Sequence, residues 1–277
     1  MIGILGPMGT FTEEAAIKYC EDININRDIV PYQTISEVFQ AVRDDKIPEG
    51  IVPMENFLNG HVMETLDNLN KNGVKIKRAI VLPIHHCLIT ILNTNNIEII
   101  KSHPQALAQC SDYLDKNYPN IERIGARSTA NAMKEIVENN LNNVAVIGSE
   151  SGAKRYGLNI LEKRIENNNL NKTMFIVIGK EESEKSERSR TSFVIIPTAN
   201  KTGLLRSILS IFADENIDLK MIQSRPDGKG SYIFYIDIEG HIEDENVVRA
   251  FAKLKNMFDD SAIKIFGSYP YVSFSGT

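Results

Sequence analysis

The sequence predicts an α/β protein made of two successive domains. Up to residue 180, short apolar strands alternate with amphipathic helices, a pattern typical of a mainly parallel sheet. Residues 180–190 contain no apolar side chain and are expected to form a linker or a solvated turn. From residue 191 the strands and helices follow the order β-α-β-β-α-β, which is the ferredoxin-like pattern. We therefore assign residues 1–180 to the first domain and residues 191–277 to the second.

The first domain is expected to begin with a strand over residues 2–5, a glycine-containing loop and a helix. Thr10 and Glu13 form a capping box at the start of this helix. In the helix expected over 104–116, the apolar residues fall on one face, as burial against a sheet requires. We expect two lobes with a cleft between them, the second lobe covering about residues 78–158. The remaining expected elements are strands over 50–53, 79–92, 144–147 and 174–178 and a helix over 130–139.

The second domain is expected to be one sheet with helices on a single face. A hairpin turn is predicted at residues 227–230, and the strand after it alternates apolar side chains with residues of the opposite face. A domain of about 80 residues with one helical layer leaves its other sheet face or its edges available to a second copy, so we expect a dimer. The expected elements are strands over 191–197, 219–224, 231–239 and 263–271 and helices over 204–214 and 244–255.

The composition argues against several classes of function. The 31 Lys and Arg against 36 Asp and Glu give a formal net charge of −5, and no stretch interleaves dense basic residues with aromatic ones, so nucleic-acid binding is not expected. No apolar run approaches the ~20 residues of a membrane span, and the N-terminus shows no signal-peptide pattern. We expect a cytoplasmic protein that does not bind membranes. Cys20, Cys87 and Cys110 are widely spaced and predict neither a disulfide scaffold nor a zinc site.

His85 and His86 are the other candidate metal ligands. They lie in a predicted strand, where neighbouring side chains point to opposite faces and cannot bind one ion together. The spacing of Gly3, Gly6 and Gly9 does not match a nucleotide-binding loop. We therefore expect neither a metal nor a nucleotide.

Four helix starts in the first domain carry a serine or threonine where an N-cap belongs. In an α/β domain these starts gather at the carboxyl ends of the strands, where ligands bind. Their free N–H groups and positive dipole ends suit an organic anion, and an N-cap that only stabilises its helix is the alternative. Glu55 and Asn56 follow a predicted strand and occupy a similar strand-end position. The four cap residues are Thr10, Ser102, Ser128 and Ser149.

Several residue strings, in matching order and spacing, carry a family resemblance. They are Gly6-Pro7-Met8-Gly9-Thr10-Phe11-Thr12, Val52-Pro53-Met54-Glu55-Asn56, Gly60-x-Val62, Ser102-His103-Pro104-Gln105-Ala106-Leu107-x-Gln109-Cys110, Ser128-Thr129 and Gly148-Ser149-Glu150. On these strings the chain resembles the prephenate dehydratase family over nearly its whole length. The C-terminal part is similar to the ACT domain, on Thr202-Gly203-Leu204-Leu205 and Gln223-Ser224-Arg225-Pro226. The resemblance implies a bilobed, periplasmic-binding-protein-like catalytic domain, a ferredoxin-like ACT regulatory domain, and a homodimer or homotetramer.

The resemblance also implies an activity and a set of site residues. The activity is conversion of prephenate to phenylpyruvate, CO2 and water in phenylalanine biosynthesis, with no metal or organic cofactor and with L-phenylalanine as inhibitor. Thr173 would assist the leaving hydroxyl group. The substrate would be bound or oriented by Glu55, Asn56, Ser102, Gln109, Ser128, Thr129 and Phe175, and the L-phenylalanine site would be formed by Gly203, Leu204, Gln223, Ser224, Arg225 and Pro226.

Two positions depart from the family pattern. Met174 follows Thr173 where the family carries an arginine, and Phe57 follows Asn56 where a small hydroxyl residue is usual. If that arginine binds a substrate carboxylate, its loss costs about 1.5–3 kcal/mol, unless Arg127 or Lys101 supplies the charge. If it only braces the lobes, methionine can pack in its place at little cost.

These departures leave two other functions open. One is a non-catalytic sensor of prephenate or of an aromatic amino acid. The other is a diverged prephenate-consuming enzyme, for example one that decarboxylates without dehydration, although the retained Thr173 argues against it.

Overall fold

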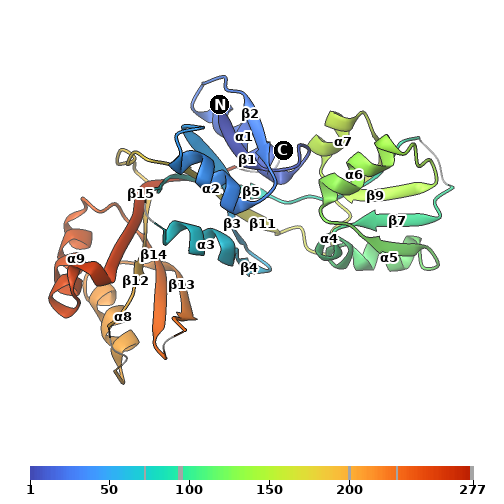
Figure 1. Ribbon diagram of the computed structural model, residues 1–277. Coiled ribbons are helices and arrows are strands. Elements are labelled where there is room, and N and C mark those ends of the chain that lie inside the picture. Colours follow the sequence, from blue (N-terminus) through green and yellow to red (C-terminus); the bar gives the residue numbers. More distant parts are fainter. Residues whose placement is uncertain (72, 93–95, 199–200, 229, 275–277) are drawn as a thin grey trace.

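The computed structural model describes residues 1–71, 73–92, 96–198, 201–228 and 230–274. Figure 1 shows three bodies, with the first lobe in blue at the centre, the second lobe in green to its right, and the C-terminal domain in orange and red at the lower left. Lys229 of the expected hairpin turn, and residues 199–200 and 275–277 of the expected second domain, lie outside the described residues. None of the helices in the described part of the chain has the length and apolar character needed to cross a membrane.

A mixed sheet forms the first lobe, where a mainly parallel one was expected. β1 is parallel to β2 and β3, but β11 is antiparallel to both β3 and β5, because it re-enters the lobe from the second lobe. α1 packs on one face of this sheet, and α2 and α3 pack on the other. The elements are β1 (Ile2–Leu5), α1 (Phe11–Asp22), β2 (Ile29–Tyr32), α2 (Ile35–Arg43), β3 (Glu49–Asn56), β4 (Gly60–His61), α3 (Met63–Leu69), β5 (Lys75–Pro83) and β11 (Lys172–Gly179).

The second lobe has its own sheet, in the strand order β10-β6-β9-β7-β8. β9, β7 and β8 are parallel, and β6 is antiparallel to both β9 and β10. Its elements are β6 (Cys87–Thr90), β7 (Ile99–Ser102), α4 (Pro104–Gln109), α5 (Ser111–Asn117), β8 (Glu122–Gly125), α6 (Thr129–Glu138), β9 (Val144–Gly148), α7 (Glu150–Tyr156) and β10 (Asn159–Lys163).

The structure corrects two predicted elements of the first domain. The strand expected over 79–92 is broken at residues 84–86, so that β5 belongs to the first lobe and β6 to the second. After Pro83 the chain leaves the first sheet, and the Ile84 N–H donates to the Asn171 carbonyl at 2.8 Å instead of to a strand. The helix expected over 104–116 is two short helices, α4 and α5, which meet at Cys110.

The C-terminal domain has the predicted order of strands and helices. Its strands lie in the order β13-β14-β12-β15, with α8 and α9 packed on one face. The Phe193 and Phe251 rings meet edge to face there, with centroids 5.0 Å apart. The elements are β12 (Ser189–Ile195), α8 (Leu204–Asp214), β13 (Leu219–Pro226), β14 (Tyr232–Glu239), α9 (Glu245–Met257), a short 3-10 helix (Asp260–Ala262) and β15 (Ile263–Ser273).

β15 joins the C-terminal domain to the first lobe. Along most of its length it is antiparallel to β12, and at its end residues 271–273 pair in parallel with β5. The two sheets are therefore continuous. At the crossing, Gly267 approaches β5 so closely that a Cβ atom would lie 2.4 Å from the Ile76 carbonyl oxygen. Only glycine fits this crossing without a shift of the backbone.

We expect Gly267→Ala to lower the free energy of unfolding by about 1–3 kcal/mol, because the added methyl group meets backbone that cannot rotate away. Urea denaturation would measure this. Gly125→Ala is a suitable control, since a Cβ there makes only ordinary contact with Pro104 at 3.6 Å. Equal losses in the two variants would contradict the role assigned to Gly267.

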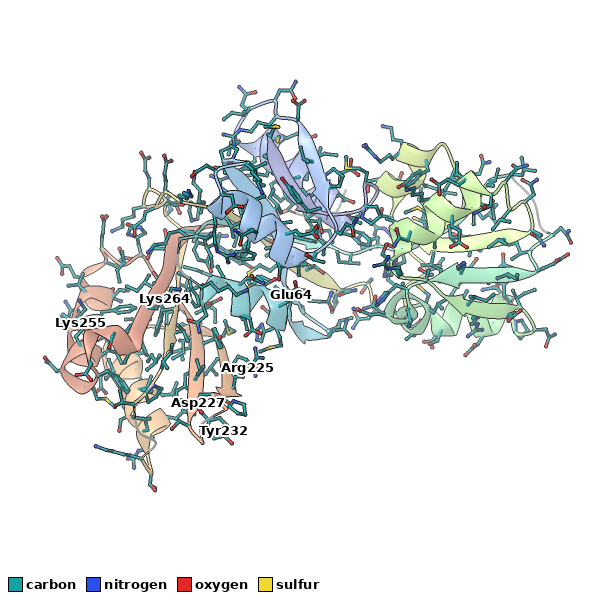
Figure 2. All side chains as sticks on the ribbon, in the orientation of Figure 1. Glu64, Arg225, Asp227, Tyr232, Lys255 and Lys264 are labelled. Atoms are coloured by element: carbon teal, nitrogen blue, oxygen red, sulfur yellow. The ribbon has the colours of Figure 1, made fainter. Side chains whose placement is uncertain are left out.

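The other face of the C-terminal sheet packs against the first lobe. Met221 and Tyr235 share one apolar core with Leu66 of α3. Two cations of the C-terminal domain lie at this boundary (Figure 2): Arg225 forms an ion pair with Asp67 of α3, and Lys264 donates hydrogen bonds to carbonyl groups at the end of α3. The C-terminal domain therefore contacts the first lobe through apolar side chains, the Arg225–Asp67 ion pair, hydrogen bonds from Lys264 and a shared sheet.

Candidate active site

Two segments join the lobes, and both contribute to the candidate site. The outgoing segment, residues 84–86, follows β5, and the returning segment, residues 164–171, precedes β11. Glu166 ties them together, because one carboxylate oxygen lies 2.7 Å from His85 Nδ1 and the other accepts a 2.8 Å hydrogen bond from the His86 main-chain N–H. We call the two joining segments the hinge. The two histidines, which were expected in a strand, lie in this hinge and are fixed there by Glu166.

Thr173 lies directly after the returning segment and is 9 % exposed. Asn56, at the end of β3, pairs with Thr173 across the strands, and its side-chain N–H donates to Thr173 Oγ1 at 2.9 Å. The Asn56 side-chain oxygen accepts hydrogen bonds from the main-chain N–H groups of Leu58 and Asn59, which fix the orientation of the amide. Among the described residues, the Thr173 hydroxyl accepts this hydrogen bond and donates none of its own. That hydrogen is available to a ligand.

Asn171 is a further site residue, and the sequence alone did not single it out. It is 1 % exposed, and its side-chain oxygen accepts a 2.8 Å hydrogen bond from Asn56. Its side-chain nitrogen is buried and has no hydrogen-bond partner in the described part of the chain. Because an unpaired buried donor is costly, this nitrogen is suited to a substrate oxygen.

Gln109 forms a similar arrangement on the side of the second lobe. Its side-chain oxygen lies 2.9 Å from His86 Nε2, and its buried nitrogen has no partner among the residues described. His86 is 3 % exposed, and burial lowers its pKa, so the imidazole is neutral near pH 7. A neutral imidazole bonded to the amide oxygen through Nε2–H holds the Gln109 amide with its N–H groups unused.

In the second lobe, the predicted helix starts at Ser128 and Ser149 lie at the carboxyl ends of strands, as expected. Ser128 Oγ accepts from the Asn131 N–H at 2.9 Å at the start of α6, and Ser149 Oγ accepts from the Gly152 N–H at 3.0 Å at the start of α7. Thr129 is the first residue of α6. Such helix starts present unpaired N–H groups to a ligand.

Ser102 differs from the other predicted caps. The N-cap of α4 is His103, whose ring accepts from the Gln105 N–H, because Pro104 occupies the first helical position. Ser102 ends β7, is fully buried, and donates to the Ile147 carbonyl at 2.8 Å. Its hydroxyl therefore links β7 to β9 within the sheet, below the helix starts.

A cavity of about 560 Å³ lies between the lobes. Gly6, Pro7 and Tyr32 line it from the first lobe, and Arg127 and Ser128 line it from the second. Arg127 thus carries a positive charge into the cleft.

The other candidate for a replacement charge, Lys101, is engaged elsewhere. Its side chain is paired with Glu135 at 2.5 Å. Phe57, the second departure from the family pattern, is 46 % exposed, and its main-chain N–H donates to the Lys172 carbonyl.

Met174 points away from this site. Neighbouring residues of β11 face opposite sides of the sheet: Phe175 packs with the core under α1, and Met174, 1 % exposed, packs in the core shared with α3 and the C-terminal domain. Arg190 of β12 lies beside it, with Nη1 3.8 Å from the Met174 sulfur. Glu55 pairs with Met174 across the strands, and its Oε1 lies 3.7 Å from His61 Nδ1. Glu55 and Met174 therefore lie on the opposite side of the sheet from Thr173, whereas Phe175 lies on the same side as Thr173, in the core under α1.

We expect Met174→Leu to leave kcat within about threefold of wild type and the free energy of unfolding within about 1.5 kcal/mol, since it exchanges one buried apolar side chain for another of similar volume. Steady-state kinetics and urea denaturation would check both values. A loss of activity without a loss of stability would mean that the sulfur has a role in the reaction.

The comparisons with known proteins follow the same division of the chain. Residues 2–183 match the family model for prephenate dehydratase, and residues 192–256 match that for the ACT domain. The chain belongs to the prephenate dehydratase family. Its C-terminal domain is an ACT domain, as the family resemblance implied.

Among curated relatives, the chain is 37 % identical to a bifunctional chorismate mutase/prephenate dehydratase of Stutzerimonas stutzeri, over 97 % of this chain and 73 % of that protein. It is also 37 % identical to the prephenate dehydratase of Methanocaldococcus jannaschii, over 95 % of this chain and 96 % of that enzyme. The crystal structure of an Arthrobacter aurescens prephenate dehydratase in complex with L-Phe is similar, with a TM-score of 0.88, 30 % identity, and coverage of 97 % of this chain and 89 % of that one.

The residues expected to bind L-phenylalanine lie in two places in the ACT domain. Gly203 and Leu204 are at the start of α8. The string Gln223 to Pro226 forms the end of β13, the edge strand of the described sheet. Of these residues, Arg225 reaches the catalytic domain through its ion pair with Asp67.

Proposed function

We propose that this protein is a prephenate dehydratase, which converts prephenate to phenylpyruvate, CO2 and water. The observation that carries the proposal is the Thr173 hydroxyl, which accepts a hydrogen bond from Asn56 and has its own hydrogen available at the hinge between the lobes. The family membership and the sequence identity to curated prephenate dehydratases support it.

In the reaction, the bond between the ring and its carboxylate breaks and releases CO2. The electron pair moves through the ring and expels the hydroxyl group opposite, which leaves as water once it has gained a proton. A threonine hydroxyl is too weak an acid to act alone. The Asn56 side-chain N–H donates to a lone pair of Thr173 Oγ1, which leaves the hydroxyl hydrogen of Thr173 directed to the departing oxygen. When the hydroxyl gives up this proton, solvent replaces it.

Buried amide donors are suited to the oxygens of prephenate. The side-chain nitrogens of Asn171, in the returning segment, and of Gln109, in α4 of the second lobe, have no hydrogen-bond partner among the described residues. The start of α6 at Ser128 and Thr129, with Arg127 directly before it, offers N–H groups and a positive charge from the second lobe. These groups would bind the two carboxylates and hold the ring against Thr173.

The remaining predicted site residues have supporting places in this proposal. Ser102 braces the second-lobe sheet, Phe175 anchors β11 beside Thr173 in the core under α1, and Glu55 lies on the side of β3 that faces the ACT domain. Each would position a neighbouring group and not contact prephenate.

The direct test is to incubate the purified protein with prephenate near neutral pH, where uncatalysed breakdown is slow, and to follow phenylpyruvate by its alkaline absorbance. We expect enzyme-dependent formation of phenylpyruvate. Two outcomes would overturn the proposal. Calorimetric binding of prephenate without turnover would indicate a sensor, and a decarboxylated product that retains its ring hydroxyl, seen by NMR, would indicate a diverged enzyme.

For regulation, we propose that L-phenylalanine binds where two ACT domains meet in a dimer. Among the described strands β13 is an edge strand, and its outer side can pair with a second copy. We expect L-phenylalanine to raise the melting temperature and to lower kcat, with D-phenylalanine as the control. Light scattering would give the assembly state. A monomer whose melting temperature is unchanged by L-phenylalanine would contradict this regulation.

A further inference from the structure

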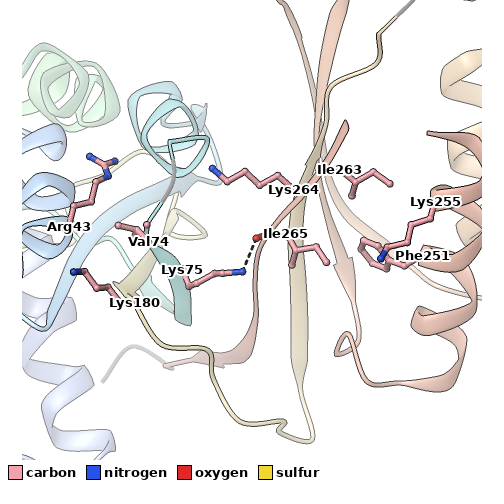
Figure 3. A pocket seen from close by; sticks show the side chains of 10 residues that line it. Arg43, Val74, Lys75, Lys180, Phe251, Lys255, Ile263, Lys264 and Ile265 are labelled. Atoms are coloured by element: carbon pink, nitrogen blue, oxygen red, sulfur yellow. Dashed lines mark hydrogen bonds between the residues drawn. The ribbon is translucent and has the colours of Figure 1, made fainter. Parts of the chain in front are cut away.

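A second cavity, of about 790 Å³, lies where the ACT domain meets the catalytic domain. The catalytic side is formed by the end of α2, the start of β5 and the end of β11, and the ACT side by α9 and the start of β15 (Figure 3). In the described part of the chain no carboxylate lines this cavity, although the chain as a whole has a net charge of −5. Five cations line it: Arg43, Lys75, Lys180, Lys255 and Lys264.

Two of these cations form ion pairs with solvent-exposed carboxylates. Lys180 lies 2.5 Å from Asp45, and Lys75 lies 3.3 Å from Glu182. The two acidic side chains are 76 % and 77 % exposed, and such surface pairs contribute about 0–1 kcal/mol. A ligand with a negative charge can replace them at little cost.

Two others are bonded to neutral carbonyl groups. Lys264 donates to the carbonyls of residues 69, 70 and 71 at 3.1, 2.6 and 2.8 Å, and Arg43 Nη2 donates to the Asn68 carbonyl at 3.1 Å. The Arg43 Nε is buried, with no hydrogen-bond partner among the described residues. Carbonyl dipoles satisfy donors but leave the net positive charge in place.

Burial and the clustered positive charges lower the pKa of one cation in the cavity. Burial lowers the pKa of Lys264, and the neighbouring charges of Lys75 and Arg43 lower it further. Burial also lowers the pKa of Arg43. A negatively charged ligand would offset the repulsion between these cations.

Part of the cavity wall is apolar. Val74 contributes from the catalytic side, and Phe251, Ile263 and Ile265 contribute from the ACT side. Figure 3 shows the Phe251 ring beside Lys255, and Lys75 donating to the Ile265 carbonyl. The volume exceeds what one inorganic ion needs, so the wall can accept the body of an organic molecule.

We propose that this cavity binds an organic anion with at least two negative charges and an aromatic body. Because its walls come from both domains, the bound anion would bridge them and stabilise their present arrangement. The site is separate from Thr173 and from the residues expected to bind L-phenylalanine, and the proposal does not depend on the dehydratase activity.

The test is calorimetry at constant ionic strength and pH 7.5 with four probes: phenyl phosphate, phthalate, benzoate and pyrophosphate. Phenyl phosphate and phthalate carry two charges and a ring, benzoate has a ring with one charge, and pyrophosphate has charge without a ring. We expect one of the first two to bind most tightly, and which one it is distinguishes a phosphate ester from a dicarboxylate. Benzoate binding as tightly would overturn the charge requirement, and pyrophosphate binding as tightly would overturn the ring requirement.

Location is tested with the double variant Lys180→Gln/Lys255→Gln. We expect the tighter probe to lose at least about tenfold in affinity, because two charged contacts are removed. The control, Lys116→Gln/Lys154→Gln, changes the net charge equally at exposed positions outside the cavity and should bind as wild type does. Equal affinity in both double variants, or no heat with any probe, would overturn the proposal.

Discussion

Replacing Thr173 with valine lowers kcat by about 100- to 10,000-fold, the range expected when a positioned proton donor is removed. Valine keeps the shape of threonine and removes the hydroxyl group that accepts from Asn56. The KM for prephenate should change much less, because the donors proposed for its carboxylates come from other residues. Phenylpyruvate formation, followed over a range of prephenate concentrations, gives both constants.

Thr173→Ser is the matched control, since it restores a hydroxyl group within reach of Asn56. We expect it to recover most of the lost rate. Urea denaturation of both variants would show that the fold is intact. If the valine variant turned over prephenate at the wild-type rate, Thr173 would have no part in the chemistry.

Replacing Asp237 with asparagine raises the stability of the protein at pH 8 and changes it little at pH 4. Asp237 lies on β14, is 1 % exposed, and has no well-formed hydrogen bond to either carboxylate oxygen among the described residues. Burial raises its pKa to about 6. The Ser192 hydroxyl and the charge of Arg190 lower that pKa only in part, and Glu55 raises it. Tyr269, which contacts Ser192, also lies nearby.

The sign of the effect follows from this shift. The carboxyl group titrates near 3.8 in the unfolded chain and near 6 in the folded one, so the folded state favours its protonated form. Its contribution therefore makes the protein less stable as pH rises from about 4 to about 6, and is constant above that range. The difference between a pKa of 3.8 and one of about 6 corresponds to about 3 kcal/mol, which is the upper limit of the gain in the free energy of unfolding expected in the asparagine variant.

Urea denaturation of wild type and Asp237→Asn at pH 4, 6 and 8 would measure this difference. Asp259→Asn, at an exposed position, is the control and should show no such dependence on pH. A variant that is less stable than wild type at pH 8 would mean that the ionised carboxylate is needed, for example to hold Arg190 beside Met174.

The sequence was most informative where local patterns decide the structure. The helix over 204–214 and the order of elements in the ACT domain were correctly predicted, because periodicity and turn residues act over a few positions. The run over 79–92 was misread as one strand, since apolar residues continue through the hinge and periodicity does not show which sheet a residue joins. The pairing of β15 with β5 connects residues far apart in sequence, and no local signal predicts it.

The same limit applies to the site. Asn56 was a candidate because it follows a predicted strand, Thr173 was found through the family resemblance, and the structure places Asn56 Nδ2 2.9 Å from Thr173 Oγ1. Asn171 was missed because it belongs to an asparagine-rich stretch that is typical of a solvated loop. The alternation of β11 already implied that Met174 faces away from its neighbours, but only the structure shows that this opposite side is the boundary with the ACT domain.

β15 also determines how the two domains depend on each other. The last residues of this strand cover the edge of β5, so a chain that ended before residue 263 would expose an unpaired strand of the catalytic sheet. An unpaired strand edge can form hydrogen bonds with a strand of another chain. The regulatory domain therefore cannot be removed without affecting the catalytic domain. A truncation made to obtain an unregulated enzyme would also remove the strand that covers the edge of the catalytic sheet.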